Sequence, residues 1–430
     1  MTARRRNCDV LIVGGGPVGG LLACLLARGG LDVALAERGA GGAGEASKGP
    51  GARDGDTRGY ALAAGTVRLL DDVGYWKPLA PDAEPIREVH VSRQGGFGSV
   101  VMDAASQGVP ALGQVVPAEC INAVLADALS ATGVERLEQT GLETLEAAGD
   151  ERREAVLAGP DGRHRLAARL VVGADGTGSA TRAAAGIEVQ RRRYAADALV
   201  FDVRSARPHR GRAFERFTPE GPLALLPQPG GRLNVVWVAP PEVCEERAAQ
   251  PESERIAELQ TRFGWRLGRL RAAGPVARFP LELVRARRLY DHRLVLAGNA
   301  AHGLHPVAGQ GLNLSLRDVA VLAGGVLAAR DPGAPEVLAA YAQARSGDID
   351  RVATVTDLLA RGLPVGEKFA PTALRRGMLL LDRIGPVRQL WAEQAMGLQP
   401  LPRRILRGLP PVPRETDRPP SAAARTGEGT

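Results

Sequence analysis

Short apolar runs separated by glycine set the pattern at the start of the chain. Residues 8–13 (CDVLIV) form an apolar run rich in β-branched side chains, residues 20–28 are rich in Leu and Ala, and residues 31–36 are apolar again. Glycines stand between these runs, at 14–16 and 29–30. A short β-branched run bounded by turns predicts a buried strand, and the longer Leu/Ala run predicts a helix. The first 36 residues therefore predict one strand–helix–strand unit.

The middle of the chain has a different pattern. Alternating apolar runs at 198–203, 223–226 and 233–238 are separated by Pro and Gly turns, which is typical of antiparallel strands. Two earlier runs, 88–92 and 99–102, flank a Gly-Gly pair and predict a hairpin. A largely antiparallel sheet is expected here.

The remaining periodicity is mainly helical, with a few further strands. Buried strands are predicted at 170–173 and 294–297, and a small antiparallel excursion at 144–157 and 163–166. Helices are predicted at 65–72, 118–131, 318–329, 336–359 and 373–396.

The composition is that of an ordinary globular protein. With 430 residues, of which 44% are hydrophobic and 24% charged, two or three structural units are expected. We expect no membrane-spanning helix, because glycine and proline break the most apolar stretch well short of ~20 residues, and no secretory signal. The four cysteines stand singly, which argues against a disulfide framework and favours a reducing cytoplasm.

The net charge of +7 comes almost entirely from arginine, which supplies 52 of the 55 basic residues. Such a preference for arginine indicates a bias in the composition of the whole chain more than a dedicated basic surface. Aromatic residues, at 4%, are few for stacking on nucleic-acid bases. Nucleic acid is therefore not an expected partner. Weak contact with a membrane surface stays open, because arginine runs such as 191–193 and 403–404 could meet anionic headgroups.

A glycine motif follows the first predicted strand. Gly14, Gly16 and Gly19 have the G-x-G-x-x-G spacing, and Glu37 ends the next strand. Gly14 permits a tight turn, Gly16 lets a pyrophosphate approach the backbone, and Gly19 lets helix and strand pack closely. The helix N-terminus offers free N–H groups to the diphosphate, and Glu37 would accept hydrogen bonds from ribose hydroxyls. The motif predicts a dinucleotide site, and a purely structural glycine turn is the alternative.

Two later segments bear on which dinucleotide is bound. Residues 173–179 (GADGTGS) follow a predicted strand, with Arg182 three residues on. Residues 298–302 (GNAAH) follow another strand and continue into 306–313 and Asp318. A nicotinamide dehydrogenase does not need two further glycine turns converging on its cofactor. A long cofactor that is held permanently does, because its ribityl chain and second phosphate need partners of their own.

Together these three motifs resemble those of the class A flavin-dependent aromatic hydroxylases, and most closely the ubiquinone-biosynthesis hydroxylase family. The resemblance covers about residues 8–400 and includes residues 56–62 (DTRGYAL), 215–227 (ERFTPEGPLALLP), 236–237 (VW) and 305–319 (HPVAGQGLNLSLRDV). It implies FAD as cofactor and NAD(P)H as transient electron donor. Dioxygen would add at the flavin C4a position, and the hydroperoxide would pass a hydroxyl group to a phenol ring.

The resemblance also implies which residues act. Pro306, whose carbonyl would lie near the transferred oxygen, is the expected catalytic residue. Phe217, Leu225 and Trp237 are expected in the apolar wall of the substrate pocket, with a plain core position as the alternative for each. Asn299 replaces the Asp that most class A enzymes carry, and Asn can still both donate and accept. The expected cofactor-binding residues are Gly14, Gly16, Gly19, Glu37, Arg58, Gln114, Asp175, Gly176, Gly298, Asn299, Gly309, Gly311 and Asn313.

No metal is expected. His302 and His305 stand three residues apart, but no acid or Cys completes a site at useful spacing. The chain also lacks a Gly-x-Ser-x-Gly elbow and a Walker glycine–lysine loop, which argues against a hydrolase or an ATPase.

The predicted fold class is α/β, with a Rossmann-like FAD-binding domain, a second, largely antiparallel-sheet substrate domain and a C-terminal helical region. The FAD-binding domain is assigned to 1–90, 104–188 and 286–362, the substrate domain to 91–103 and 189–285, the helical region to 363–410 and a flexible tail to 411–430.

The leading hypothesis is hydroxylation of a polyprenylated phenol in ubiquinone biosynthesis. A class A hydroxylase of a soluble aromatic or polyketide and a flavin-binding scaffold without oxygenase activity remain as alternatives. The protein is expected in the cytoplasm, with peripheral contact at the inner face of the membrane or with a biosynthetic complex. Residues 375–404, which mix Leu, Trp and Met with arginine pairs, are the expected docking surface, and an ordinary core helix with a basic tail is the alternative.

Overall fold

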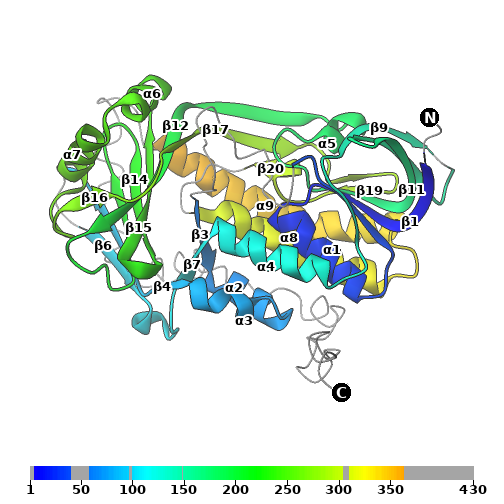
Figure 1. The fold of residues 1–430 in the computed structure, drawn as a ribbon, viewed down its shortest axis with the longest axis horizontal. Coiled ribbons are helices and arrows are strands. Elements are labelled where there is room, and N and C mark those ends of the chain that lie inside the picture. Colours follow the sequence, from blue (N-terminus) through cyan, green and yellow to red (C-terminus); the bar gives the residue numbers. More distant parts are fainter. Residues whose placement is uncertain (1–3, 40–57, 96–98, 148, 304–308, 363–430) are drawn as a thin grey trace, which may run out of the picture.

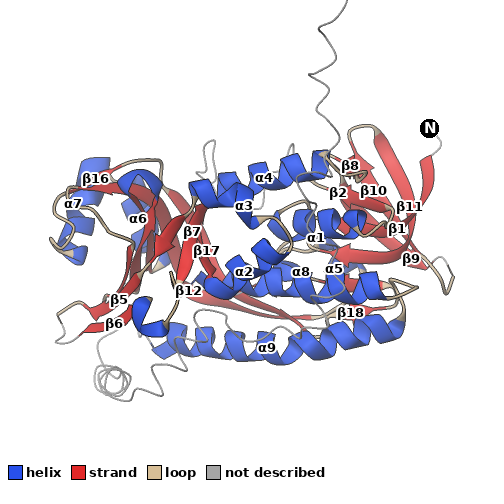
Figure 2. Ribbon diagram, turned by 90° about the horizontal axis from the view of Figure 1, so that it is seen from below, coloured by secondary structure: helices blue, strands red, loops and turns tan. Residues whose placement is uncertain are grey.

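The fold is built from two large sheets that lie at opposite ends of the molecule, with long strands and a long helix running between them (Figure 1). A view turned by 90° shows a third, smaller sheet where the two parts meet (Figure 2). The computed structural model describes residues 4–39, 58–95, 99–147, 149–303 and 309–362.

The first sheet has eight strands, and its central strands are parallel. Its strands, in spatial order, are β18 (Tyr290–Asp291), β19 (Leu294–Leu296), β11 (Gly162–Gly173), β1 (Arg4–Val13), β2 (Val33–Ala36) and β8 (Glu135–Leu137), with β10 (Arg153–Gly159) and β9 (Gly141–Ala147) continuing from β11. The helices α1 (Pro17–Arg28), α4 (Ala118–Ser130) and α8 (Gln310–Ala328) lie together in a layer beside it (Figure 1). Because β1 is buried on both faces, its end is the continuous apolar run that the sequence shows.

The second sheet has nine strands and is antiparallel except for the β13–β5 pair. Its strands, in spatial order, are β20 (His302–Gly303), β17 (Ala277–Ala286), β12 (Val189–Ser205), β15 (Arg232–Ala239), β14 (Pro222–Gln228), β13 (Arg212–Phe217), β5 (Glu88–Arg93) and β6 (Ser99–Asp103), and β16 (Leu270–Ala272) pairs with β12. The helices α6 (Pro241–Ala249) and α7 (Glu252–Phe263) pack on one face, around a core that includes Phe214 and Trp237. The opposite face is turned toward the rest of the protein.

The third sheet covers part of that opposite face. It consists of β3 (Gly59–Ala63), β7 (Gly113–Pro117) and β4 (Glu84–Ile86), and its side chains Ile86 and Val115 share a core with Ala213 of β13. The remaining helices are α2 (Ala64–Asp72), α3 (Trp76–Leu79), α5 (Ala180–Ala184), α9 (Pro335–Gly362) and the 3₁₀ turns Ala80–Asp82, Ala105–Gln107, Pro229–Gly231 and Gly298–Ala300.

The α/β architecture agrees with the sequence, but several elements differ from the predicted ones. The two strands expected at 163–166 and 170–173 are one continuous strand, β11, because its first half pairs with β10 and its second half with β19. Helix α8 begins at Gln310 and not at 318, so the glycine motif itself starts the helix. The third sheet, α6 and α7 were not predicted. The domain boundaries stay a prediction, and the helical region 363–410 and the tail 411–430 lie outside the described residues.

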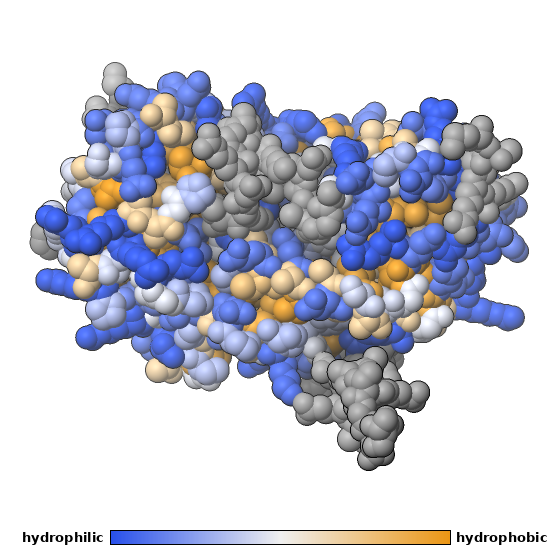
Figure 3. All heavy atoms as spheres, in the orientation of Figure 1, coloured by the Kyte–Doolittle hydropathy of each residue, from blue (hydrophilic) through white to orange (hydrophobic). Residues whose placement is uncertain are grey.

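Helix α8 has the length and apolar composition to cross a membrane. In the fold, 72% of its most apolar window is buried inside the protein, where it packs against α1 and α9. It is therefore a core helix. Over the surface seen in Figure 3, apolar side chains gather near α2 and α4, and polar side chains cover most of the rest.

Candidate functional site

Three parallel strands bring the three glycine motifs to one edge of the first sheet. Val13 at the end of β1 lies beside Gly173 of β11, and Gly173 lies beside Leu296 of β19. Backbone hydrogen bonds continue past the strand ends, since Ala174 N–H donates to Val13 (2.8 Å) and Ala297 N–H donates to Gly173 (2.9 Å). Segments that are more than 100 residues apart in the sequence therefore form one site. Ligands of open α/β sheets bind at this carboxyl edge.

Two glycines of the first motif are required by the protein itself. Gly14 has φ +107°, and a Cβ there would lie 2.4 Å from the carbonyl oxygen of Ala174. A Cβ on Gly19 would lie 1.9 Å from the carbonyl oxygen of Gly14. Both distances are far inside van der Waals contact, so larger side chains would push apart the turn, the helix and the second motif.

Gly16 is different, because a Cβ there would meet no protein atom within 4 Å. It is the N-cap of α1, and the unpaired N–H groups of the first helical turn lie next to it. The free space in front of this residue therefore suits a group that approaches the backbone from outside. A diphosphate fits both the space and the partial positive charge of the helix N-terminus.

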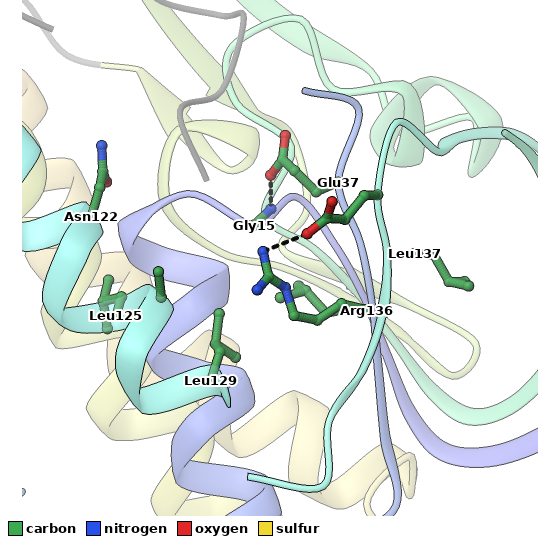
Figure 4. A pocket seen from close by; sticks show the side chains of 10 residues that line it. Gly15, Glu37, Asn122, Leu125, Leu129, Arg136 and Leu137 are labelled. Atoms are coloured by element: carbon green, nitrogen blue, oxygen red, sulfur yellow. Dashed lines mark hydrogen bonds and ion pairs between the residues drawn. The ribbon is translucent and has the colours of Figure 1, made fainter. Parts of the chain in front are cut away.

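A hollow of about 420 Å³, open to solvent, continues from this turn (Figure 4). The Glu37 carboxylate lies at its rim, where Oε2 accepts the Gly15 N–H and Oε1 accepts the Gly39 N–H at 3.1 Å. Asn122 and Leu125 of α4 form another wall. The sequence did not indicate the α4 residues, because nothing near them in the sequence marks a site, and it did not single out Gly15, which occupies a variable position inside the glycine motif.

The second motif is held by its own side chains. Asp175 accepts hydrogen bonds from Ser179 Oγ (2.5 Å) and from the N–H and Oγ1 of Thr181 (2.9 and 3.0 Å), so it caps the start of α5. Arg182, which is buried, donates to the carbonyl oxygens of Thr177 and Ala300, both at 2.8 Å. Arg182 thus ties the second motif to the third. Gly176 has φ +79° and open space where a Cβ would stand.

The third motif is anchored on a buried carboxylate, Asp318 of α8. Its Oδ2 accepts the Gly298 N–H (2.9 Å) and lies 2.6 Å from Nε2 of His302, while its Oδ1 accepts Nε–H of Arg345 (2.7 Å) from α9. Burial alone would raise the pKa of Asp318, but His302 and Arg345 outweigh burial and bring it to about 2. The carboxylate is therefore charged at every physiological pH. Arg345 also donates to Asp348 (2.7 Å).

Asn313 connects the start of α8 to the third sheet. Its Oδ1 accepts the Ala63 N–H (2.8 Å), and its Nδ2 donates to the carbonyl oxygens of Ala61 (2.8 Å) and Gly309 (3.0 Å). Gly309 has φ +61° and is the N-cap of α8, and a Cβ on Gly311 would meet nothing within 4 Å. Asn313 thus holds the backbone of this loop in place, and Gly311 leaves it accessible.

The other expected cofactor residues lie around this edge. Asn299 is exposed, directly after β19, and Gly298 before it has φ +59°. The Arg58 guanidinium lies over the rings of Tyr60 (5.3 Å) and Phe279 (5.6 Å), so it stands between the third sheet and β17. The half-buried Gln114 lies on β7, between β3 and β4. Pro306 and His305 lie outside the described residues.

The expected pocket wall is wrong for two of its three residues. Leu225 and Trp237 are fully buried on the face of the second sheet that packs against α6 and α7. The guanidinium of Arg247, on α6, covers the Trp237 ring at 4.0 Å. Because side chains alternate along a strand, these residues cannot also face the first sheet. They are core, and Phe217, on the other face, is half-buried.

Within the described ranges, no three His, Cys, Asp or Glu side chains are grouped closely enough to hold a metal ion. The contacts of His302 are those of the Asp318 anchor.

Comparisons with known proteins agree with this geometry. A family described as "FAD binding domain" matches residues 7–356. The chain is 40% identical, over 94% of its length and 93% of the relative's, to "Ubiquinone hydroxylase UbiL" of Rhodospirillum rubrum. It is 31% identical, over 91% and 98%, to "3-demethoxyubiquinol 3-hydroxylase" of Escherichia coli. The crystal structure of p-nitrophenol 4-monooxygenase from Pseudomonas putida has the same fold, with a TM-score of 0.74 at 20% identity over 94% and 99% of the two chains.

Replacing Gly16 by Val should abolish cofactor binding and leave the fold intact, because the added side chain meets only the space in front of the helix N-terminus. The measurement is the FAD released on denaturation of purified protein, together with the circular dichroism spectrum. Gly133→Val is the matched control, since Gly133 is an exposed glycine with equally open surroundings, in the turn between α4 and β8. Full FAD occupancy in the Gly16 variant would show that the diphosphate lies elsewhere.

Replacing Asp318 by Asn should destabilise the protein by about 3–5 kcal/mol at pH 7, because the buried Arg345 loses the more deeply buried of its two counter-charges. The pKa of Asp318 is lowered on folding, so its stabilisation is present above about pH 4 and fades as the pH falls toward 2. Urea unfolding of wild type and variant should therefore differ most near neutral pH. Asp348→Asn, at a more exposed partner of the same arginine, should cost less, and equal losses would contradict the anchor.

Proposed function

The chain belongs to the FAD-binding-domain family and is an FAD-dependent aromatic-ring monooxygenase, and we propose that its substrate is a polyprenylated phenol of ubiquinone biosynthesis. The observation that carries the proposal is the 40% identity to a ubiquinone hydroxylase over nearly the full length of both chains. All three glycine motifs lie within the matched family region, and they meet at one edge of the first sheet.

In the proposed reaction, NAD(P)H supplies two electrons, one atom of dioxygen enters the ring and the other leaves as water. FAD, when bound, supplies the electron transfer and the oxygen insertion. The protein binds, orients and excludes water. The N–H groups next to Gly16 would hold the diphosphate, Glu37 the adenosine ribose, and Asn299 a hydroxyl of the ribityl chain. The Gly309–Gly311 backbone would lie against the flavin ring, with Asn313 holding that loop.

Three further assignments complete the proposal. Arg58, between Tyr60 and Phe279, would supply a positive charge where the cofactor and the second sheet meet. Asp175 and Gln114 would form hydrogen bonds with the cofactor near its phosphates and its ribityl chain. Pro306 is proposed to shape the oxygen transfer through its carbonyl group, on the resemblance alone.

The open face of the second sheet is the proposed wall of the substrate pocket. Its side chains Ala224, Val236 and Phe279 are half-buried, whereas the residues on either side of Ala224 and Val236 in β14 and β15 are packed against α6 and α7. An apolar wall excludes water from the reacting atoms and provides a surface for an aromatic ring. This face replaces Leu225 and Trp237 in the pocket.

With NAD(P)H and oxygen, the enzyme should hydroxylate a phenol that carries a prenyl chain, and the same phenol without the chain should have a much lower kcat/KM. Each methylene that leaves water contributes about 0.8 kcal/mol, so full burial of one five-carbon unit contributes about 4 kcal/mol, or about a thousandfold in binding. Steady-state turnover with both compounds tests this, with the Gly16→Val protein as the control without cofactor. Turnover confined to the unprenylated phenol would favour a hydroxylase of soluble aromatics. A cofactor-loaded protein that forms no product with any phenol would favour a flavin-binding scaffold.

A prenylated substrate also bears on location. We propose that the protein meets its substrate as a peripheral protein at an anionic membrane surface, through residues 375–404, which lie outside the described residues. In flotation assays, binding should be stronger to anionic than to neutral liposomes and weaker after removal of the residues that follow Gly397. Binding that is indifferent to both changes would contradict this docking surface.

A further inference from the structure

Glu215 is an ionisable residue of the second sheet whose two cross-strand neighbours are apolar. It lies on β13, directly opposite Ala224 of β14 and Val91 of β5. Its neighbour Phe214 points into the core against α7, so alternation places Glu215 on the opposite face, with Ala213. Glu215 also begins the segment 215–227 that carries the family resemblance, and no step described so far uses it.

Strand β3 joins the face that carries Glu215 to the cofactor edge, and its Ala61 contacts both. On one side, Ala61 packs in the small core that contains Ala213 and Leu226. On its other side, its carbonyl oxygen accepts Nδ2–H of Asn313, and a Cβ on Gly309 would lie 3.3 Å from its Cβ. Ala61 therefore lies between this part of the sheet and the loop proposed to lie against the flavin.

Beyond this small core, the face of the sheet opens. Leu226 packs in the small core under the third sheet, whereas Ala224, two residues before it and opposite Glu215, does not belong to that core. Ala224 is half-buried, as is Val236 beside it. Glu215 is half-buried as well. Its side chain thus stands where the cover of the third sheet ends, at the proposed wall of the substrate pocket.

The Glu215 carboxyl makes no hydrogen bond and no ion pair within the part of the chain that the structure describes. Burial raises its pKa to about 7, with no contribution from a neighbouring charge. On its own face of the sheet, the charged side chain of β5 is Arg93, and Arg216 lies on the opposite face. The other charged side chains on the surrounding elements are the Glu88–Arg212 ion pair and Asp103 at the strand ends, Glu84 of β4 and Arg58 before β3. The carboxyl is thus left available to a group that is not part of the protein.

We propose that Glu215 accepts the proton of the substrate's phenolic hydroxyl group, an inference that rests on the proposed function. The O–H bond breaks, its electron pair stays on the phenolic oxygen, and the proton moves to a carboxylate oxygen of Glu215. The phenolate ring is richer in electrons than the phenol ring and is more readily attacked by an electrophilic oxygen. After hydroxylation the ring carbon loses its hydrogen as a proton, which completes the water formed from the second oxygen atom, and Glu215 returns its own proton to the phenolic oxygen. A carboxyl that titrates near neutral pH suits both transfers.

The test compares Glu215→Gln with wild type and with Glu88→Gln, a control on the neighbouring strand whose carboxylate pairs with Arg212 at the surface. The substrate is 2-farnesylphenol in detergent micelles. The measurements are FAD content, the rate of flavin reduction by NAD(P)H, hydroxylated product per NAD(P)H consumed, and the pH dependence of kcat/KM. For Glu215→Gln we expect normal FAD content and reduction, but about 10²–10⁴-fold slower product formation at pH 8.

The pH dependence separates a proton acceptor from a structural residue. In the wild type, kcat/KM should rise through pH 7, and this rise should be absent in Glu215→Gln. The defect of the variant should shrink as the pH approaches ~10, because the phenol then ionises without a base. A structural defect would not be relieved in this way.

Stability gives a second readout. Folding raises the pKa of Glu215 from its ordinary value of 4.5 to about 7, so the folded state holds the Glu215 proton more tightly than the unfolded state does. The resulting stabilisation is fully present below about pH 4.5 and is lost as the pH rises through 7. The Tm of Glu215→Gln relative to wild type should therefore increase over that range.

Each outcome decides the proposal. Wild-type rates and an unchanged pH profile in Glu215→Gln would overturn it and leave the proposed function standing. If Glu215→Gln loses FAD or unfolds, Glu215→Asp, which keeps the carboxyl, must retain the rise near pH 7, and its absence would overturn the proposal. A wild type that hydroxylates no phenol would overturn the proposed function and this inference with it.

Discussion

The site depends on one buried charge. Asp318 has no exposed surface, yet it is held ionised by Arg345 of α9, with His302 and the Gly298 N–H completing its contacts. Removing a carboxylate from water costs several kcal/mol, and this cost is offset where a counter-charge and several hydrogen-bond donors meet it in good geometry. Here the donors come from three different elements. The carboxylate therefore fixes the loop after β19 relative to both α8 and α9, and that loop forms one side of the cofactor edge.

The rest of the edge is held by side chains that form hydrogen bonds with backbone atoms of another segment. Arg182 ties the second motif to the third through two carbonyl oxygens, and Asn313 ties the start of α8 to β3. Gly14 and Gly19 let the backbones approach more closely than any side chain allows. These contacts fix the described backbone of the three motifs relative to one another, and such preorganisation lowers the entropy cost of binding a long cofactor. Gly16 and Gly311, which like Gly176 have open space where a Cβ would stand, are the proposed points at which that cofactor approaches the backbone.

Local patterns were enough to predict the α/β class, the first strand–helix–strand unit and the three glycine motifs, because turns, strands and helix starts depend on residues that are close together in the sequence. What they could not supply was the partner of each residue. Arg345 gives no local sign that it meets Asp318, and Asn122 gives none that it lines the hollow beside Glu37. The helices α6 and α7 were missed because Pro and Gly turns dominate the surrounding pattern, and α8 begins early because its glycine motif was interpreted as a loop.

The misplacement of Leu225 and Trp237 has a more specific cause. A strand pattern predicts which residues share a face, but it does not predict which face will meet the cofactor, since both faces of the second sheet are covered in part and both carry apolar residues. Only the helices that follow β15 decide it, by covering the face with Trp237. Once that face is closed, the strand period assigns Glu215, Ala224 and Val236 to the other one. A lone carboxylate among small apolar residues contradicts the pattern of a plain core face, and such local contradictions are tolerated chiefly where function requires them. Glu215, which fits the fold least well, is therefore the residue of the open face that points most directly to its chemistry.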